Sequence, residues 1–218
     1  MDKLTQSVEE YLEAVFKLTR DGSPTTVGQV ADALAVSPPS VSEMMRRLRA
    51  AGLVAAGAGA GIALTAVGRA EGARLVRRHR LSERFLVDVL DMPWDAVHEE
   101  ACKLEHALGP EVEARLAAQL GNPRTCPHGQ VIPGEDGELD EEPLRPLSTL
   151  DPGDEAMISC VTEEKADLLR YLASLGLLPD TEVAVESVAP FGGPLLIRVA
   201  GAQYALGREV AGKIMVRG

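Results

Sequence analysis

The spacing of apolar residues predicts three helices at the start of the chain. Residues 5–20 repeat apolar side chains at i, i+3, i+4, i+7 and i+8, the pattern of an amphipathic helix. The members of that stripe are Val8, Tyr11, Leu12, Val15 and Phe16. Two shorter stripes follow Thr25-Thr26 and Ser37, whose hydroxyls can cap helix N-termini. We expect the third helix over about 38–50, with prolines in its first turn, where a missing N–H costs little.

The next segment predicts a two-stranded hairpin. Gly52-Leu53-Val54 begins an extended stretch, AAGAGAG forms a turn and IALT forms a second short strand. Helix, turn, helix and hairpin follow one another in a winged helix-turn-helix, with 38–50 as its recognition helix. Helical runs over about 66–90 and 94–120 come next, separated by Asp91-Met92-Pro93.

The last third of the chain predicts a small β domain. Residues 121–147 collect prolines and glycines and indicate a linker. Beyond it, a helix over about 164–175 interrupts five short strands, at Ala156–Val161, Glu182–Val188, Leu195–Val199, Tyr204–Leu206 and Ile214–Val216. Short strands separated by glycine and proline turns are typical of a small β-barrel.

Composition narrows the class of partner. Aromatic residues make up only 3% of the chain, which argues against a stacking platform for single-stranded nucleic acid. The net charge is −11, but residues 1–90 hold 12 Lys and Arg against 10 Asp and Glu, whereas 91–150 hold 4 against 13. The acidic whole therefore contains a mildly basic first part that can approach a polyanion.

Cysteine use and hydropathy indicate a cytoplasmic protein. Three cysteines are too few for a disulfide framework, and Cys160, in a predicted strand, is expected to be a small buried residue. The N-terminus carries acids and no apolar core of a signal peptide. The uncharged stretch 52–68 is shorter than the ~20 residues of a membrane span, so no membrane partner is expected.

All four histidines lie between residues 79 and 128, among cysteines and glutamates. At 100° per residue, four ligand-type residues share one arc of the 94–120 helix: His98, Cys102, Glu105 and His106. His79 and Glu83 share a face of the preceding helix, and Cys126-Pro127-His128 lies in the linker. These side chains are ligands for divalent transition metals, so the cluster predicts metal binding.

The same stretches resemble the diphtheria toxin repressor and manganese transport regulator family of metal-dependent repressors. The similar segments are SVEEYLEAVF, VADALAVSPPSVSEMMRRLRAAGLV, ALTAVGRAEG, RRHRLSERFL, VHEEACKLEHALGPEVEARL, CPHG and IPG. The resemblance implies a winged helix-turn-helix domain (1–70), a helical metal-binding and dimerisation domain (71–120), a linker (121–147) and an SH3-like FeoA-type domain (148–218). It also implies a homodimer formed through the apolar stripe of the 94–120 helix, which contains Val97, Ala101, Leu104 and Leu108.

The resemblance implies two Mn(II) or Fe(II) sites per subunit. The primary site would use Glu10, Cys102, Glu105 and His106, with Glu13 as a further oxygen donor. Two ligand sets are open for the second site. One uses His79, Glu83 and His98 with polar groups of the C-terminal domain. The favoured set is Glu83, Cys126, His128 and an acid near Asp167, for which Glu163 and Glu164 are rivals. His79 and His98 are further candidate members of this set.

The expected function is a repressor of metal-uptake genes that binds palindromic double-stranded operator DNA when metal fixes the first helix. Residues expected to contact bases are Ser37, Pro39, Ser40 and Glu43, with a surface salt bridge as the alternative for Glu43. Arg46, Arg47 and Arg49 are expected at phosphates. Two alternatives are a thiol redox regulator using Cys102 and Cys126, and a metalloenzyme. The chain has no HExxH motif or glycine-rich phosphate loop.

Overall fold

The computed structural model describes residues 4–20, 22–140 and 142–218, and it divides into two compact units. The first unit runs from the N-terminus to His79 and takes in Leu104–Leu108 and Pro133–Leu139. The second unit contains Arg80–Lys103, Gly109–Ile132 and Asp140–Gly218. The chain passes between the units several times, so segments far apart in sequence build each one.

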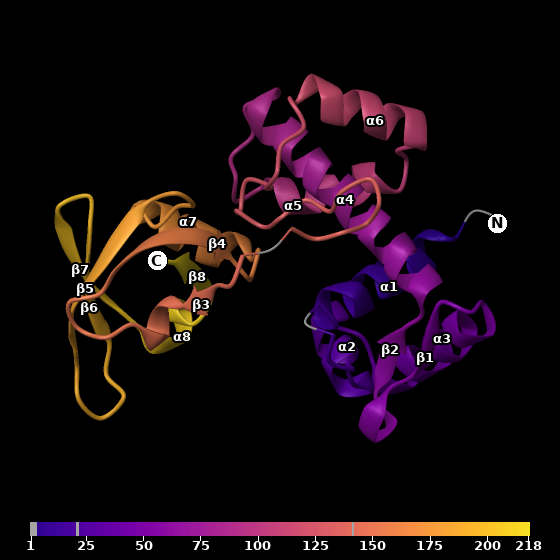
Figure 1. The fold of residues 1–218 in the computed structure, drawn as a ribbon, viewed down its shortest axis with the longest axis horizontal. Helices are drawn as coiled ribbons and strands as arrows, with labels where there is room; N and C mark the ends of the chain where they lie inside the picture. Colours follow the sequence, from indigo (N-terminus) through magenta and orange to yellow (C-terminus); the bar gives the residue numbers. More distant parts are fainter. Residues whose placement is uncertain (1–3, 21, 141) are drawn as a thin grey trace. The chain divides into compact units, whose positions relative to one another are not determined.

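The first unit has the predicted order of three helices and a hairpin (Figure 1). The helices are α1 (Gln6–Leu18), α2 (Val27–Leu34) and α3 (Pro38–Ala50), and the strands are β1 (Val54–Ala56) and β2 (Ile62–Leu64). The antiparallel strands pair Val54 with Leu64. The predicted helix-turn-helix and hairpin are therefore confirmed, and the AAGAGAG segment is the turn between the strands.

Side-chain caps begin the helices at the expected residues. The Thr26 hydroxyl accepts from the Gln29 N–H, and the Gln29 side chain accepts from the Thr26 N–H, which forms a capping box at α2. At α3 the Ser37 hydroxyl accepts from the Ser40 N–H, which caps that helix. The apolar stripes of the three helices meet in one core, with Leu12, Val41 and Leu48 almost completely buried. The stripes thus fix how α3 sits in this unit.

A close contact joins the hairpin to α4 (Ala66–Asp88). The Thr65 hydroxyl accepts from the Gly68 N–H at 3.0 Å and donates to the Gly52 carbonyl at 2.7 Å. A Cβ atom on Gly68 would lie 1.8 Å from the Leu53 carbonyl oxygen, so only glycine fits there. Thr65 and Gly68 therefore set the path from the hairpin into the long helix.

The expected single helix over 94–120 is wrong. The structure contains two helices, α5 (Val97–Glu105) and α6 (Pro110–Gln119). Gly109 is extended, with φ −83° and ψ 163°, because a residue before proline is pushed out of the helical region. Pro110 then occupies the first turn of α6, where its missing N–H is tolerated.

The apolar stripe of α5 is only partly available to a partner. Val97 and Ala101 are fully buried, and both pack with Leu86 of α4 inside the second unit. Leu104 of the same stripe is 36% exposed. The expectation that a second subunit covers the whole stripe is therefore wrong for Val97 and Ala101, since α4 already covers them.

The C-terminal part of the second unit is a six-stranded antiparallel sheet with the order β3-β8-β4-β5-β6-β7. Its strands are β3 (Arg145–Pro146), β4 (Glu155–Val161), β5 (Glu182–Val188), β6 (Leu195–Val199), β7 (Ala202–Leu206) and β8 (Ile214–Arg217). Two helices accompany the sheet, α7 (Ala166–Ser174) and α8 (Arg208–Ala211). Within residues 142–218 no pairing of β3 with β7 closes it, yet the class of a small SH3-like β domain after a helical part is confirmed.

The sheet and its helices enclose an aliphatic core. Ile158, Leu169 and Ile197 are fully buried there, and Trp94 packs against the edge of this core. From 155 to 160 along β4, buried residues alternate with exposed or partly exposed ones, as a strand with one face on a core requires. No helix in the described ranges has both the length and the apolar character needed to cross a membrane.

Candidate metal centres

Five ionisable side chains gather in the first unit, and we call them the first cluster: Glu9, Glu13, His79, Glu105 and His106. The Nδ1 atom of His106 lies 2.6 Å from Oε2 of Glu9, and its Nε2 atom lies 3.3 Å from Oε1 of Glu105. The Nδ1 atom of His79 lies 2.6 Å from Oε2 of Glu105. Carboxylates from α1 therefore meet ligand-type groups from α4 and from the end of α5.

Burial and neighbouring charges act in opposite directions on the first cluster. Burial disfavours a charge on Glu13, but the cations of Lys17 and His79 outweigh it and lower the pKa of this carboxyl to about 2. Burial raises the pKa of Glu105, and a hydrogen bond to His79 offsets part of that rise. Lys17 Nζ is 2.8 Å from Glu13 Oε1. Glu13 is thus held as an anion, while the raised pKa of Glu105 favours its protonation.

The structure places the expected primary ligands in different surroundings. Glu105 and His106 lie in the first cluster, but Glu10 is exposed and accepts a hydrogen bond from Gln6 at 3.1 Å. The α1 residues that are buried are Glu9 and Glu13, 6% and 7% exposed. They are i, i+4 neighbours on the helix edge beside the apolar stripe, and that spacing was a signal for Glu9.

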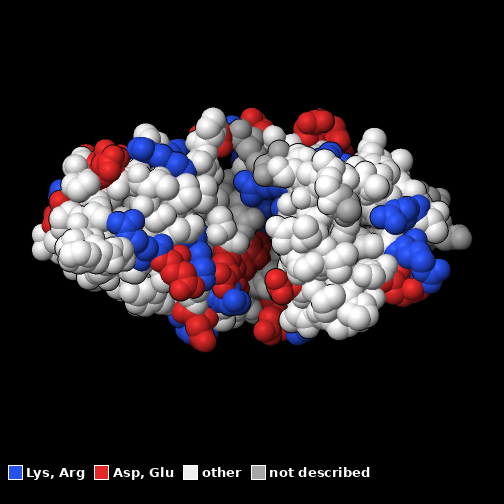
Figure 2. Space-filling model, turned by 90° about the horizontal axis from the view of Figure 1, so that it is seen from below, with Lys and Arg blue, Asp and Glu red and all other residues white. Residues whose placement is uncertain are grey.

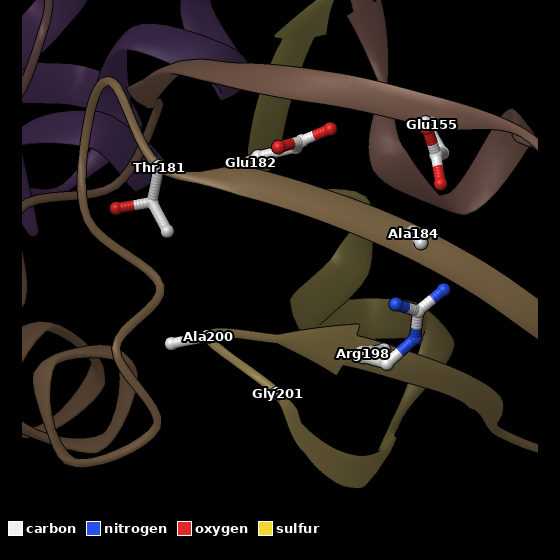
Figure 3. A pocket seen from close by; sticks show the side chains of 7 residues that line it. All are labelled: Glu155, Thr181, Glu182, Ala184, Arg198, Ala200 and Gly201. Carbon is white, nitrogen blue, oxygen red and sulfur yellow. The ribbon is translucent and has the colours of Figure 1, made fainter.

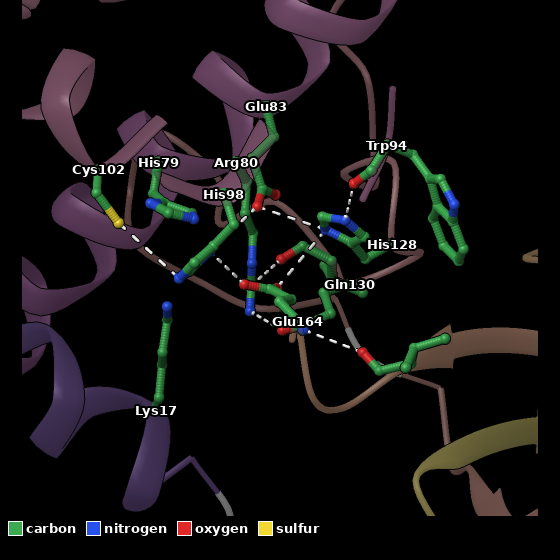
Figure 4. Close-up of polar contacts among 12 residues, drawn as sticks. Lys17, His79, Arg80, Glu83, Trp94, His98, Cys102, His128, Gln130 and Glu164 are labelled. Carbon is green, nitrogen blue, oxygen red and sulfur yellow. Dashed lines mark hydrogen bonds and ion pairs between the residues drawn. The ribbon is translucent and has the colours of Figure 1, made fainter. Parts of the chain in front are cut away.

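A second cluster forms within the second unit from Glu83, His98, Cys126, His128 and Glu164. Figure 4 labels all of these side chains except Cys126. Ligand atoms of four of them, all except His98, lie within 4.8 Å of one another. His98 Nδ1 is 2.7 Å from Glu164 Oε2 and 3.6 Å from Glu83 Oε1. Two carboxylates, two imidazoles and a thiol therefore converge from α4, α5, a loop and the segment before α7.

A tight turn aims Cys126 and His128 at this cluster. The Cys126 N–H donates to the Gln130 carbonyl at 2.9 Å, and the Gly129 N–H donates to the Cys126 carbonyl at 2.9 Å. Gly129 has φ +83°, and a Cβ atom there would lie 1.9 Å from the Ser159 carbonyl oxygen. Only glycine allows the turn and its approach to β4, so Gly129 positions both side chains.

The imidazole of His128 is oriented for metal binding. Its Nε2 atom is 2.8 Å from the Trp94 carbonyl oxygen, so Nε2 carries the proton that is donated. Its buried Nδ1 atom lies 3.4 Å from Glu83 Oε1 and makes no hydrogen bond to any residue that the structure describes. A neutral ring in this tautomer directs a lone pair from Nδ1 into the cluster, as a metal ligand requires. The donor set therefore fits a divalent transition metal.

Burial and hydrogen bonds shift the pKa values of side chains in the second cluster. Burial opposes charge on His98, but hydrogen bonds with Cys102 and Glu164 raise its pKa to about 11. Burial raises the pKa of the Cys126 thiol well above its ordinary value. A buried thiol that resists ionisation is unlike the accessible thiolates of redox sensors, so the geometry does not favour the thiol redox alternative.

Three other expected ligands are placed as follows. Asp167 is exposed and pairs with Arg170, whereas its rival Glu164 lies in the second cluster. Glu163 forms ion pairs with Lys165 and Lys213 at 2.7 Å each. Cys102 is partly buried, with Sγ 3.9 Å from His98 Nε2. The acid that reaches the second cluster is therefore Glu164.

Figure 3 shows a pocket on the sheet. Its lining residues are Glu155, Thr181, Glu182, Ala184, Arg198, Ala200 and Gly201. Arg198 pairs with Glu186 at 2.9 Å. The lining includes no histidine or cysteine, so this pocket does not resemble the two clusters.

Helix α3 exposes all seven residues that the sequence assigned to DNA: Ser37, Pro39, Ser40, Glu43, Arg46, Arg47 and Arg49. Its apolar side is buried at Met44, Met45 and Leu48. Glu43 and Arg46 form an ion pair at 2.5 Å, as the salt-bridge alternative anticipates. On the face shown in Figure 2, basic side chains stand in small groups beside acidic ones.

Comparison with known proteins identifies all three parts of the chain. Residues 3–59 match the N-terminal DNA-binding domain of iron-dependent repressors, 65–134 match their metal-binding and dimerisation domain, and 145–218 match the FeoA domain. The chain is 33% identical to the iron-dependent repressor IdeR of Mycobacterium leprae over 99% of both chains. It is 38% identical to the diphtheria toxin repressor of Corynebacterium jeikeium over 62% of this chain and 57% of that protein.

Solved structures agree. A manganese-dependent transcriptional repressor in complex with manganese superposes with a TM-score of 0.88 at 34% identity, covering 96% of this chain and 98% of that one. The repressor ScaR with bound Cd²⁺ gives 0.84 at 32% identity, with the same coverage. The chain therefore belongs to the iron-dependent repressor family, and it is a metal-dependent DNA-binding transcriptional repressor, not an enzyme.

Proposed function

We propose that this repressor is activated by Mn(II) or Fe(II) at two centres per subunit and then binds a palindromic operator as a homodimer. The observation that carries the proposal is that each compact unit contains a ligand group of its own. Glu13, His79 and Glu105 form one in the first unit, and Glu83, Cys126, His128 and Glu164 form one in the second. Relatives named as iron-dependent and manganese-dependent repressors support this choice of metals. Genes of metal uptake are the expected targets.

The first centre uses Glu13, His79 and Glu105, with Glu9 and His106 beside them. Glu9 and Glu13 take the place that was expected for Glu10. Without metal, two buried carboxylates must be compensated by protons and by Lys17. A bound dication supplies that compensation and ties α1 to α4 and to the end of α5. Metal thereby favours the placement of α1 that completes the centre. The shift in this equilibrium equals the difference between the binding free energies of the metal for the two placements of α1.

The second centre uses Glu83, Cys126, His128 and Glu164, with His98 adjacent. The metal would supply positive charge that removes the repulsion between the two carboxylates and stabilises the Cys126 thiolate. A thiolate and imidazoles favour Fe(II) and later metals, whereas carboxylates suit Mn(II). Glu164 joins the C-terminal domain to the centre, so metal there also fixes that domain to the CPHG turn.

The DNA contact follows from α3. We propose that Ser37, Pro39 and Ser40 at its N-terminus approach base edges, and that Arg46, Arg47 and Arg49 approach phosphates. Glu43 is available to a cytosine amino group only if its ion pair with Arg46 opens. Two such helices in a dimer would enter successive major grooves, about 34–36 Å apart.

The proposed domain division remains 1–70, 71–120, 121–147 and 148–218. The matched family segments support boundaries near 60 and 140. The last stretch of the linker does not pack as one piece, since Pro133–Leu139 joins the first unit and residues from Asp140 join the second.

The test measures operator binding by fluorescence anisotropy with Mn(II), with Fe(II) under anaerobic conditions, and after chelation. We expect affinity to rise with metal and to fall with chelator. Glu13→Ala and Glu105→Ala should abolish the metal response, whereas Glu10→Ala, a matched change on the exposed side of the same helix, should retain it. Equal binding with and without metal would refute activation, and a larger loss for Glu10→Ala than for Glu13→Ala would refute the ligand assignment.

A further inference from the structure

A buried hydrogen-bond chain ends on Glu164 of the second cluster. An Arg80 guanidinium nitrogen donates to the Gln130 side-chain oxygen at 2.6 Å, and a second one donates to the Val131 carbonyl. The Gln130 side-chain nitrogen donates to the Val161 carbonyl at 3.1 Å and to Glu164 Oε1 at 2.8 Å (Figure 4). Arg80 is 3% and Gln130 is 9% exposed, so water competes little with these bonds.

These hydrogen bonds allow only one orientation of the Gln130 side-chain amide. A guanidinium donates only, so the group that faces Arg80 must be the amide oxygen. The amide nitrogen then faces Val161 and Glu164, where two acceptors use its two hydrogens. The charge of Arg80 therefore holds the neutral Gln130 amide in the orientation in which it donates to the Glu164 carboxylate.

Glu164 needs such a support because it lies outside regular structure. Residues 162–165 connect β4 to α7, and no helix or strand holds the Glu164 backbone. One carboxylate oxygen receives the Gln130 hydrogen bond, while the other lies 2.7 Å from His98 Nδ1. Both oxygens of this carboxylate are thus held in place, and Oε1 lies 3.8 Å from His128 Nδ1. Because Gln130 uses only one lone pair of Oε1, this oxygen keeps a second lone pair for a metal.

We propose that Arg80 and Gln130 are positioning residues that preorganise Glu164 for metal at the second centre. The inference rests on the proposed second centre. Removing the donor while keeping the acceptor for Arg80 should weaken that centre, because Glu164 must then be ordered at the expense of binding energy. Loss of an outer hydrogen bond to a metal ligand typically costs about 10–100-fold in metal affinity.

Two substitutions separate positioning from a structural role. Gln130→Glu keeps an acceptor for Arg80, but its carboxylate cannot donate to Glu164 or to the Val161 carbonyl. The ion pair that it forms with the buried Arg80 offsets the loss of these two hydrogen bonds in the metal-free fold. Gln130→Met removes both functions and is expected to lower stability as well. Gln203→Met is the matched control, since Gln203 also donates to a carboxylate, that of Glu186, but on an exposed face of the sheet.

The experiment titrates the metal-free full chain with Co(II) under anaerobic conditions, in a Cys102→Ser background. The thiolate-to-cobalt absorption band then reports Cys126, and thermal unfolding of the metal-free chain reports stability. We expect Gln130→Glu to bind Co(II) at least tenfold more weakly, with an unfolding temperature close to that of the parent. Gln203→Met should match the parent in both measurements.

Three outcomes would overturn the inference. Equal Co(II) affinity in Gln130→Glu and the parent, with the band present in both, would refute the positioning role alone. An affinity loss in Gln130→Glu matched by an equal loss in Gln203→Met would show that the effect is not specific to Gln130. Absence of the band in the parent would refute the second centre itself, and the role of Gln130 would fall with it.

Discussion

Replacing Gly129 by alanine tests how the CPHG turn builds the second centre. Gly129 has φ +83°, a conformation that costs a residue with a Cβ atom about 1–2 kcal/mol. The new Cβ would also lie 1.9 Å from the Ser159 carbonyl oxygen, far inside any contact distance. The turn must therefore move away from β4 by about 1 Å or more, given carbon–oxygen contacts of about 3 Å.

That movement strains two backbone hydrogen bonds, from the Val161 N–H to the His128 carbonyl at 3.0 Å and from the Cys126 N–H to the Gln130 carbonyl at 2.9 Å. Each contributes about 0.5–1.5 kcal/mol. Together with the backbone term, Gly129→Ala should lower the free energy of unfolding of this unit by about 2–5 kcal/mol. Cobalt affinity at the second centre should fall more than tenfold, since Cys126 and His128 move with the turn.

The assay is urea unfolding of the metal-free chain, followed by fluorescence of Trp94. This residue is the only tryptophan, and its ring centre lies 5.5 Å from that of His128. Gly121→Ala is the control, because Gly121 has φ +76° but an added Cβ atom would meet nothing within 4 Å. It should cost only the backbone term, about 1–2 kcal/mol. A Gly129→Ala cost no larger than that of Gly121→Ala would refute the role assigned to the contact with β4.

Three further predictions concern protons, a helix cap and DNA. Metal at the second centre must displace protons from two of its ligands, the Cys126 thiol and the His128 imidazole, because the pKa of each is raised. Affinity should therefore rise with pH by about tenfold per unit for each proton released, and calorimetry in buffers of different ionisation enthalpy counts those protons; a flat profile from pH 6 to 8 would contradict this. Thr65→Ala should cost about 0.5–2 kcal/mol in urea unfolding, because the cap to the Gly68 N–H is lost; an unchanged unfolding free energy would argue against the cap. Arg47→Ala should lower the slope of log affinity against log salt by about 1 without altering operator preference; a change in preference instead would place Arg47 at a base.

Interactions between residues close in sequence determined the helices and strands, and the sequence also contained most of the candidate metal ligands. Helical spacing and the Thr26 and Ser37 caps depend on neighbours within four residues, so α1 to α3 could be read directly. The same holds for Glu105, at the end of α5, and His106, just after it, because their shared arc follows from 100° per residue. The sequence also indicates the break at Gly109-Pro110, because a proline disfavours the helical conformation of the residue before it.

Tertiary structure decided which candidates meet. Glu9 and Glu13 lie beside the apolar stripe of α1, whereas Glu10 lies away from it. Only the packing of the first unit shows that the two buried carboxylates meet His79, Glu105 and His106. Likewise, Glu164 and Asp167 are three residues apart, and the position of residues 162–165 after β4 brings Glu164 alone to the second cluster. Local periodicity shows which residues of an element share a face, but not which other element that face contacts. Its rotation against other elements depends on the shape of a core assembled from distant segments, and that shape is a property of the whole fold.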